Sequence, residues 1–269
     1  MDVYLNEYSS DDAIRKYTSR TAGYGISYLL ENDYAEVYLT AIDQFLKVPA
    51  NTALKLLEFG CGGGMNIITL LSLLERKGRS VVRAYGTDFS EALINAANVE
   101  SKTLLTPEQQ KKMHFAVARN EELISDLAGG LHMSRGELEN SFHVILGVNT
   151  FRYCHRLGKT RQCAQDITDL LAPGGICINI DMNRKFPAFR SKWSSRHIPA
   201  AERYLPSLEE YAAPFEEVGL EILRKENFCW IPHSASRTMT NIYRLLAPAL
   251  NVLVQPWAMR SLVISRKRA

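Results

Sequence analysis

The amino-acid sequence predicts an α/β protein built on one seven-stranded, mostly parallel sheet with helices on both faces. From Leu54 onward, short apolar runs of strand length alternate with segments of helical length. This alternation is typical of strand-helix-strand units, in which parallel strands are buried on both faces. A glycine-rich turn, Gly60-Cys61-Gly62-Gly63-Gly64, joins the first apolar run to the first of these helices. A chain of 269 residues is long enough to build one such core.

The apolar pattern assigns each element in order. Strands are predicted at 54–59, 81–87, 113–118, 142–148, 175–181, 220–230 and 261–266. Helices are predicted between them at 64–77, 90–101, 120–128, 159–171 and 207–218, with Pro173-Gly174-Gly175 ending the fourth.

Two helical segments are predicted outside this regular pattern. Residues 10–47 form two helices around the break at Gly23-Tyr24-Gly25. Residues 1–50 are therefore expected to be an N-terminal helical cap, and residues 51–269 the main domain. Within that domain a helical insertion is expected at about 233–257. We interpret the insertion as a helix packed on the core, with a lid or a dimer contact as alternatives.

The composition excludes several classes of protein. A net charge of +3, from 32 basic and 29 acidic residues, is too small to indicate a nucleic-acid partner by itself. The five cysteines are scattered and never spaced as CxxC, so neither a disulfide framework nor a zinc site is expected. Residues 1–7 lack the apolar stretch of a signal peptide, and no apolar run is long enough to span a membrane. A cytoplasmic protein is the expectation.

The spacing within the glycine turn points to a cationic ligand. Dinucleotide-binding enzymes use GxGxxG, but counted from Gly60 the third glycine position is Met65. The spacing is instead Glu58-x-Gly60-x-Gly62-x-Gly64. A carboxylate at the strand end would repel a pyrophosphate and suits a ligand that carries an α-ammonium group.

The segment resembles motif I of the class I S-adenosylmethionine-dependent methyltransferases, and residues 54–266 follow the element order of that Rossmann-like family. The resemblance implies a methyltransferase that uses S-adenosylmethionine and releases S-adenosylhomocysteine. It implies that Gly60, Gly62 and Gly64, with Cys61 between them, let the methionine and ribose lie over the turn. It also implies that Glu58 acts on the methionine amino group, directly or through water.

Further cofactor contacts are expected after the second, third and fourth strands. Asp88 follows the second strand and can accept hydrogen bonds from two ribose hydroxyls, or alternatively cap the next helix. Phe89 is expected on the adenine face, with an ordinary core position as the alternative. Many family members carry an acid after the third strand, but Arg119 stands there, so the adenine contact is assigned to Asn120, with Glu121 as the alternative. Asn149 completes the expected set.

The loops after strands four and five, residues 149–156 and 181–193, should face the transferred methyl group, because ligands bind at the carboxyl ends of such strands. His155 and Tyr153 are the candidate bases, although His155 could instead shape its loop and Tyr153 could line a pocket. The first loop lacks the [DN]PP[YF] run of enzymes that methylate exocyclic amines. Asp181 and Asn183 are separated by Met182, unlike the Asp-Asn pair of metal-dependent enzymes, so no catalytic metal is expected.

Cations and aromatic side chains alternate in these two loops. They could form a solvated rim, a pocket for a carboxylate or phosphate on the acceptor, or a surface for RNA bases. The predicted acceptor-binding residues are Phe151, Arg152, Arg190 and Trp193, with Tyr24 from the cap, and the further cations are Arg156, Arg184, Lys185, Lys192 and Arg196.

The sequence therefore predicts a small-molecule methyltransferase. The alternatives are an RNA- or protein-directed methyltransferase, and a cofactor-binding protein without catalysis. The acceptor is expected to be anionic and partly apolar. A nucleic-acid partner is not expected, and a homodimer is compatible with the sequence.

Overall fold

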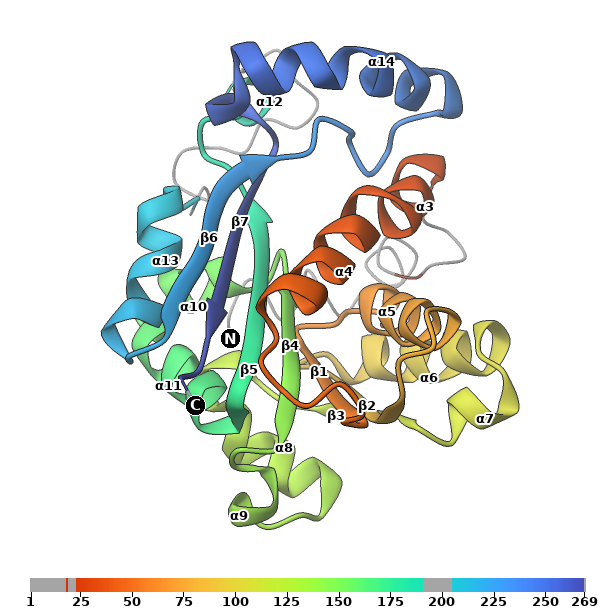
Figure 1. Ribbon diagram of the computed structural model, residues 1–269, viewed down its shortest axis with the longest axis vertical. Coiled ribbons are helices and arrows are strands. Elements are labelled where there is room, and N and C mark those ends of the chain that lie inside the picture. Colours follow the sequence, from red (N-terminus) through yellow and green to blue (C-terminus); the bar gives the residue numbers. More distant parts are fainter. Residues whose placement is uncertain (1–17, 19–22, 191–204, 269) are drawn as a thin grey trace.

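The computed structural model describes residues 18, 23–190 and 205–268, and these residues form the expected mixed, mostly parallel sheet (Figure 1). The strand order is β3-β2-β1-β4-β5-β7-β6, and within the described sheet only β7 runs antiparallel to its neighbours. The strands are β1 Leu54–Phe59, β2 Val81–Asp88, β3 Met113–Val117, β4 Phe142–Val148, β5 Leu171–Met182, β6 Glu221–Phe228 and β7 Arg260–Arg266.

Helices cover both faces of this sheet. The longer ones are α3 Tyr24–Glu31, α4 Asp33–Phe45, α5 Met65–Arg76, α6 Glu91–Leu104, α8 Leu123–Leu131, α11 Thr160–Leu170, α13 Leu208–Glu217 and α14 Arg237–Leu253. The short ones are α7 Pro107–Gln110, η1 Asn120–Glu122, α9 Arg135–Leu138, α10 Phe151–Arg156, α12 Pro187–Arg190 and η2 Gln255–Trp257.

Each face of the sheet has its own apolar core, because successive side chains of a strand point to opposite faces. Leu56 and Ile178 belong to the core beneath α3, α4 and α5. Their neighbours Leu57 and Cys177 belong to the core beneath α8, α10, α11 and α13. Burial on both faces explains why the strands read as continuous apolar runs in the sequence.

The N-terminal helices α3 and α4 share the first core with the sheet through residues such as Leu29 and Tyr38. They also contact α5, and the amides of Gly25 and Ile26 donate to the carbonyls of Ala235 and His233. A Cβ on Gly25 would overlap this loop, so glycine allows the close approach. The two helices are therefore held by α5 and, through Gly25 and Ile26, by the loop at residues 233–235.

Two details of the predicted elements were wrong. The second predicted N-terminal helix is divided at Asn32 into α3 and α4. The fifth strand begins at Leu171 rather than 175, because Leu171 already pairs with Phe142 before a register irregularity. Gly174 lies in this stretch with φ +76°, where a side chain would overlap the carbonyl of Lys47. The predicted insertion forms α14, but Thr240 is the one buried residue within this fully described helix. The helix therefore packs on the core along one side, where Tyr243 contacts the first core, and its other side is exposed.

None of the helices in the described ranges combines the length and the apolar character that a membrane crossing requires.

Candidate active site at the glycine turn

The glycine turn folds into a tight loop between β1 and α5. Gly60, Gly62 and Gly64 all have positive φ, of +60°, +54° and +80°, a conformation that residues with a Cβ rarely adopt. A Cβ on Gly60 would also overlap the hydroxyl of Thr150, which follows β4. The amide of Cys61 donates to the carbonyl of Thr87 (2.7 Å) and so ties the turn to β2. The backbone is therefore accessible to a ligand without intervening side chains.

Glu58 is fully buried at the end of β1 and points toward the start of α5. Its carboxylate accepts hydrogen bonds from the Asn66 side chain (3.0 Å) and from the backbone amide of Ile67 (2.9 Å). Tyr38 of α4 donates to the other end of Asn66 (2.9 Å). Burial raises the pKa of Glu58 to about 8, although both hydrogen bonds favour its charged form. Both hydrogen bonds of Glu58 therefore come from residues at the start of α5.

Asp88 lies at the carboxyl end of β2 and is also buried. One carboxylate oxygen accepts from the amide of Gly62 (2.9 Å), and the other accepts from the amide of Ser90 (2.9 Å). Ser90 itself caps α6 through its own hydroxyl. The predicted capping alternative is therefore only partly met, because Asp88 holds the turn before α6 and also holds the glycine turn. Each carboxylate oxygen can accept a second hydrogen bond from a ligand hydroxyl.

Burial disfavours the charged form of both acids at the turn. Burial raises the pKa of Asp88 as well, against the hydrogen bonds from Ser90 and Gly62, and the charge of Asp88 further raises the pKa of Glu58. No cation of the described residues forms an ion pair with Glu58 or Asp88. Buried carboxylates without a cationic partner are costly, so the site favours a positively charged ligand.

The remaining predicted cofactor residues surround the turn. Asn120, in η1, donates to the Thr150 hydroxyl (2.6 Å) and so lies across the crevice from Gly60. Phe89 is half-buried next to Asp88. Arg119, which stands where an acid was expected, pairs with Asp126 and Glu122 on the surface and does not point into the site.

Asn149 follows β4 in a left-handed conformation (φ +57°) and leads to a buried arginine that the sequence did not indicate. Arg260 donates to the Asn149 side-chain oxygen (2.8 Å), and its other terminal nitrogen lies 2.9 Å from His233 Nε2. His233 is in turn 3.1 Å from the Tyr34 hydroxyl. This network joins the loops after β4 and β6 to β7 and α4. Arg260 is 5% exposed, and its Nε has no hydrogen-bond partner among the described residues.

Arg152 and Asp181 form the second charged group at this edge of the sheet. Asp181 is fully buried and accepts from the backbone amide of Arg152 (3.0 Å), and the Arg152 Nε lies 3.5 Å from its carboxylate. Burial raises the pKa of Asp181, an effect that Arg152 and Arg260 oppose. Arg152 also donates to the Tyr153 hydroxyl (2.6 Å) and lies over its ring. Tyr153 thus positions Arg152, which fits the pocket-lining alternative.

Phe151 and His155 were expected in a loop, but the segment forms α10 and turns both toward the second core. Phe151 is fully buried and stacks on Phe215, with ring centroids 4.8 Å apart, so packing accounts for it and an acceptor contact does not. His155 meets Phe151 and Tyr211 edge-on. Burial lowers the pKa of His155 to about 4, which makes it a weak base. The aromatic packing and the lowered pKa favour the alternative in which His155 has a structural role in α10.

The other predicted acceptor residues are only partly brought together. Arg184 pairs with Glu210, while Lys185 and Arg156 are exposed. Tyr24 is exposed on α3, and Arg237 of α14 lies over its ring. Trp193, Lys192, Arg196 and the side chain of Arg190 lie outside the described residues. The described residues hold no group of three or more potential metal ligands.

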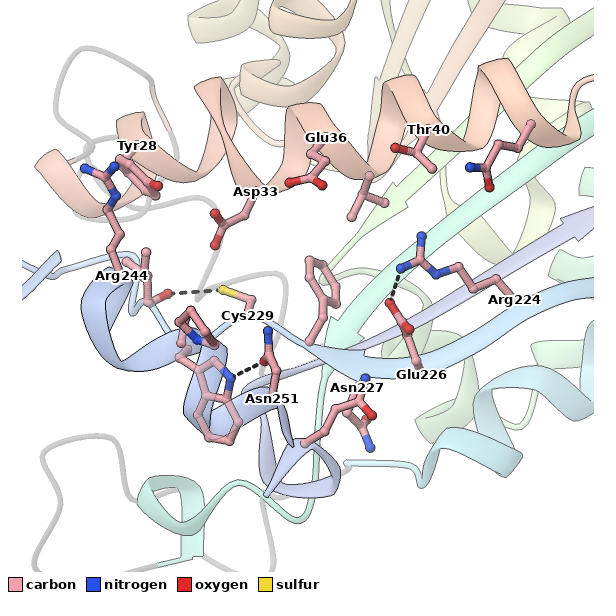
Figure 2. A pocket seen from close by; sticks show the side chains of 18 residues that line it. Tyr28, Asp33, Glu36, Thr40, Arg224, Glu226, Asn227, Cys229, Arg244 and Asn251 are labelled. Atoms are coloured by element: carbon pink, nitrogen blue, oxygen red, sulfur yellow. Dashed lines mark hydrogen bonds and ion pairs between the residues drawn. The ribbon is translucent and has the colours of Figure 1, made fainter. Parts of the chain in front are cut away.

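A groove of about 940 Å³ lies away from the glycine turn, between α3 and α4 on one side and β6 and α14 on the other (Figure 2). Its polar lining includes Asp33 and Glu36 of α4, facing Asn227 of β6 and Asn251 of α14. None of the predicted cofactor residues lines it. We therefore place the candidate active site by the chemistry of the turn rather than by the size of this groove.

Comparison with known proteins finds a family model that matches part of the chain. Residues 57–177, a little under half of the chain, match the family model described as a methyltransferase domain. This segment is therefore similar to a methyltransferase domain. It includes the glycine turn, Asp88, Asn120 and the whole of α10. A comparison with curated protein sequences finds no match.

The chain is also similar to solved structures. The CurJ carbon methyltransferase is 14% identical, with 96% of this chain and 58% of that chain covered and a TM-score of 0.58. The CMeT domain of the citrinin polyketide synthase is 18% identical, with 100% of this chain and 60% of that chain covered and a TM-score of 0.59. An S-adenosylmethionine-dependent methyltransferase from Aquifex aeolicus is 14% identical, with 99% of this chain and 98% of that chain covered and a TM-score of 0.54.

The chain spans about three fifths of the length of the first two of these structures. Similarity at such low identity shows the shared fold. The family match over residues 57–177 and the shared fold agree with the methyltransferase fold expected from the sequence.

Proposed function

We propose that this methyltransferase binds S-adenosylmethionine across the glycine turn and methylates a small, partly apolar acceptor that carries an anionic group. The observation that supports the cofactor site most is the pair of buried acids, Glu58 and Asp88, on either side of a turn with exposed backbone. The cofactor carries an ammonium and a sulfonium, both cationic. The same acids oppose the pyrophosphate of a dinucleotide.

In this proposal Asp88 accepts from the ribose hydroxyls while it keeps Gly62 and Ser90 in place. Glu58 stabilises the ammonium, directly or through water, and sets the start of α5. Asn120 is available to the adenine edge on the far side of Thr150, and Phe89 to its face. S-adenosylmethionine supplies, when bound, a methyl group activated by the sulfonium. The protein then has to orient the acceptor for in-line attack.

The acceptor side supports an anionic group through its charge balance. Arg152 and Arg260 both lower the pKa of the buried Asp181, and Arg152 forms an ion pair with it. The partners of Arg260 in hydrogen bonds, Asn149 and His233, are an amide and an imidazole. Two guanidinium groups against one carboxylate leave a net positive charge, which favours a carboxylate, a phosphate or an enolate oxygen.

The outer wall of the acceptor site stays a proposal based on the sequence. We place Arg190 and Trp193 there, and Tyr24 at the cap side, because the segment after β5 leaves the sheet next to Arg152. Carbon is one acceptor atom to test, because two of the similar structures are carbon methyltransferases.

The test has two stages. Titration calorimetry with S-adenosylmethionine, S-adenosylhomocysteine and NAD should show binding of the first two and not of NAD. A screen of candidate metabolites with isotopically labelled cofactor should then identify a small-molecule acceptor. NAD binding without a response to S-adenosylhomocysteine would contradict the cofactor site. Labelling of RNA or protein in place of metabolites would contradict the small-molecule acceptor and support the macromolecular alternative.

A further inference from the structure

The surface helix α14 presents its apolar side to solvent. Leu245 is 82% exposed, Val252 85% and Leu253 77%, while Met239, Ile242 and Leu246 are between 44% and 48% exposed. Ordinary surface helices bury such a face against the protein. A contiguous row of exposed large apolar side chains marks an interaction surface.

The opposite side of α14 is the one that meets the rest of the chain. Asn251 accepts from the Trp230 side chain (2.7 Å), and Arg244, Ala247, Pro248 and Asn251 line the groove beneath the helix (Figure 2). Figure 1 shows α14 along one end of the molecule. On the same inward side Tyr243 packs against the first core and Thr240 is buried. Because these contacts fix which side of α14 meets the protein, they leave the exposed apolar face directed outward.

The spacing along that face is the spacing of a helix-helix seam. The residues Met239, Ile242, Leu246, Ala249 and Leu253 are separated by three, four, three and four positions. This is the a and d pattern of coiled coils. Leu245 and Val252 lie seven residues apart beside the seam and widen it. A seam of this kind accommodates the side chains of one facing helix.

The seam is close to symmetric about Leu246. Met239 and Leu253 lie seven residues to either side, and Ile242 and Ala249 lie four before and three after. Two such helices placed antiparallel would bring Met239 against Leu253 at both ends of the seam and Leu246 against its own copy at the centre. A two-fold axis between identical subunits produces that self-complementary arrangement.

The charges on α14 favour a second copy over a lipid surface. The arginines of the helix, Arg237 and Arg244, lie over the rings of Tyr24 and Tyr28 of α3. They are therefore on the side of the protein and leave the apolar face without charge. Two identical faces can meet with no like-charge repulsion, whereas helices that bind anionic membranes carry cations available to the lipid headgroups.

We propose that α14 is a self-association surface, on which two copies of this chain pair antiparallel through the Met239 to Leu253 seam about a two-fold axis near Leu246. A helix of 17 residues is about 25 Å long and buries less than the roughly 800 Å² per partner of a standard interface. The dimer is therefore expected to be reversible, with a Kd on the order of micromolar.

Sedimentation velocity of the full chain over a roughly hundredfold concentration range tests this directly. The wild type should shift from monomer to dimer, and Leu245→Glu should weaken the dimer about tenfold or more. The matched control is Val99→Glu, which places the same charge at an exposed apolar site on α6 and should leave the equilibrium unchanged. Both substituted side chains are exposed, and thermal melting checks that both variants fold.

Cysteine cross-linking tests the antiparallel arrangement, because all five native cysteines are buried. Leu246→Cys should oxidise to a disulfide-linked dimer, whereas Leu253→Cys should not, since its partner position is Met239. A wild type that stays monomeric throughout, or Leu245→Glu dimerising like the wild type, would overturn the proposal. The proposal would also be overturned if the protein stayed monomeric and floated with vesicles of anionic phospholipid, and if Leu245→Glu abolished that flotation. Each of these readouts is independent of cofactor or acceptor binding.

Discussion

The Asp88 carboxylate accepts a 2.9 Å hydrogen bond from the backbone amide of Gly62, so the acid that ends β2 holds the turn that follows β1. The geometry of the glycine turn and the position of the acid are therefore coupled. A ligand that bonds to Asp88 through its hydroxyls meets a carboxylate already oriented by two backbone amides.

Replacement of Asp88 by asparagine should weaken binding of S-adenosylhomocysteine at least tenfold, or about 1.4 kcal/mol, because the charge-assisted bonds to the ribose are lost. The substituted amide keeps one oxygen for a backbone N–H, so the fold should persist with a lower melting temperature. Calorimetry measures the affinity, with Asp43→Asn, an exposed acid on α4, as the control. Unchanged affinity in a folded Asp88→Asn protein would limit Asp88 to holding the turn.

Glu58 should make the stability of the ligand-free protein depend on pH. Its pKa in the fold is about 8, above the usual value of 4.5, so folding favours the protonated form. That contribution is fully present below the usual pKa and is lost as the pH rises through about 8. The melting temperature of the wild type should therefore fall more between about pH 6 and pH 9 than that of Glu58→Gln. Equal pH dependence in the two proteins would contradict the burial effect.

The same group should couple cofactor binding to proton release. A cationic ammonium near Glu58 favours the carboxylate, so binding should release a proton and become tighter as the pH rises from about 6 to 8. Calorimetry in buffers of different ionisation enthalpy measures the proton count. Glu58→Gln should show weaker binding without this release. Proton release that persists in the variant would assign it to another group.

Gly60→Ala should abolish cofactor binding and destabilise the protein. The new Cβ would overlap Thr150, and φ of +60° is strained for alanine. Gly78→Ala is the matched control, because Gly78 has φ +73° with no atom within 4 Å of the added Cβ. Both variants carry the conformational strain, and only the first closes the crevice. If both lose stability equally and both bind S-adenosylhomocysteine, the contact with Thr150 is unimportant.

His155→Gln should leave kcat within about tenfold of the wild type and lower the melting temperature, because the ring packs between Phe151 and Tyr211. The pH profile of kcat decides between packing and catalysis. A base with the pKa of His155, about 4, would add a rise in kcat near that pH, and the variant would lose it. A kcat loss of about a thousandfold or more would restore the catalytic role.

Sequence reasoning found the parts of the site that are local in the chain. Glu58, the glycines and the start of α5 lie within a few residues of one another, and the positive φ angles follow from glycine itself. Asp88 was found because parallel strands end at the same edge of the sheet. Its bond to Gly62 was not foreseen, since the loop conformation that permits it depends on both strands.

The missed residues are distant in sequence or depend on which side of a helix faces inward. Arg260 meets Asn149 across 111 positions, through an antiparallel pairing of β7 that carries no short-range signal. Phe151 was predicted in a loop because α10 has only six residues and follows its strand directly. For α14 the helical period predicted the helix, but periodicity alone does not say which of its apolar side chains pack on the core, as Tyr243 does, and which stay exposed.

Arg152 supplies the final prediction, which concerns the acceptor. Arg152→Ala should raise the acceptor KM about tenfold and leave the Kd of S-adenosylhomocysteine within about twofold, because a guanidinium that orients an anionic acceptor acts before methyl transfer. Arg152→Lys keeps the charge beside the buried Asp181 and should fold normally, while losing the two-pronged geometry. The control is Arg184→Ala, which removes an exposed cation paired with Glu210.

The two kinetic constants separate the interpretations. If Arg152→Ala weakens the cofactor and leaves the acceptor KM unchanged, the arginine holds the methionine carboxylate instead. If a neutral acceptor is turned over equally by the wild type and both Arg152 variants, the anionic group is wrong and the paired charges of this edge serve the fold. A rise in KM for a carboxylate or phosphate acceptor, with no such rise for its uncharged ester, would identify Arg152 as the residue that selects the anion, because only the charged form uses the guanidinium.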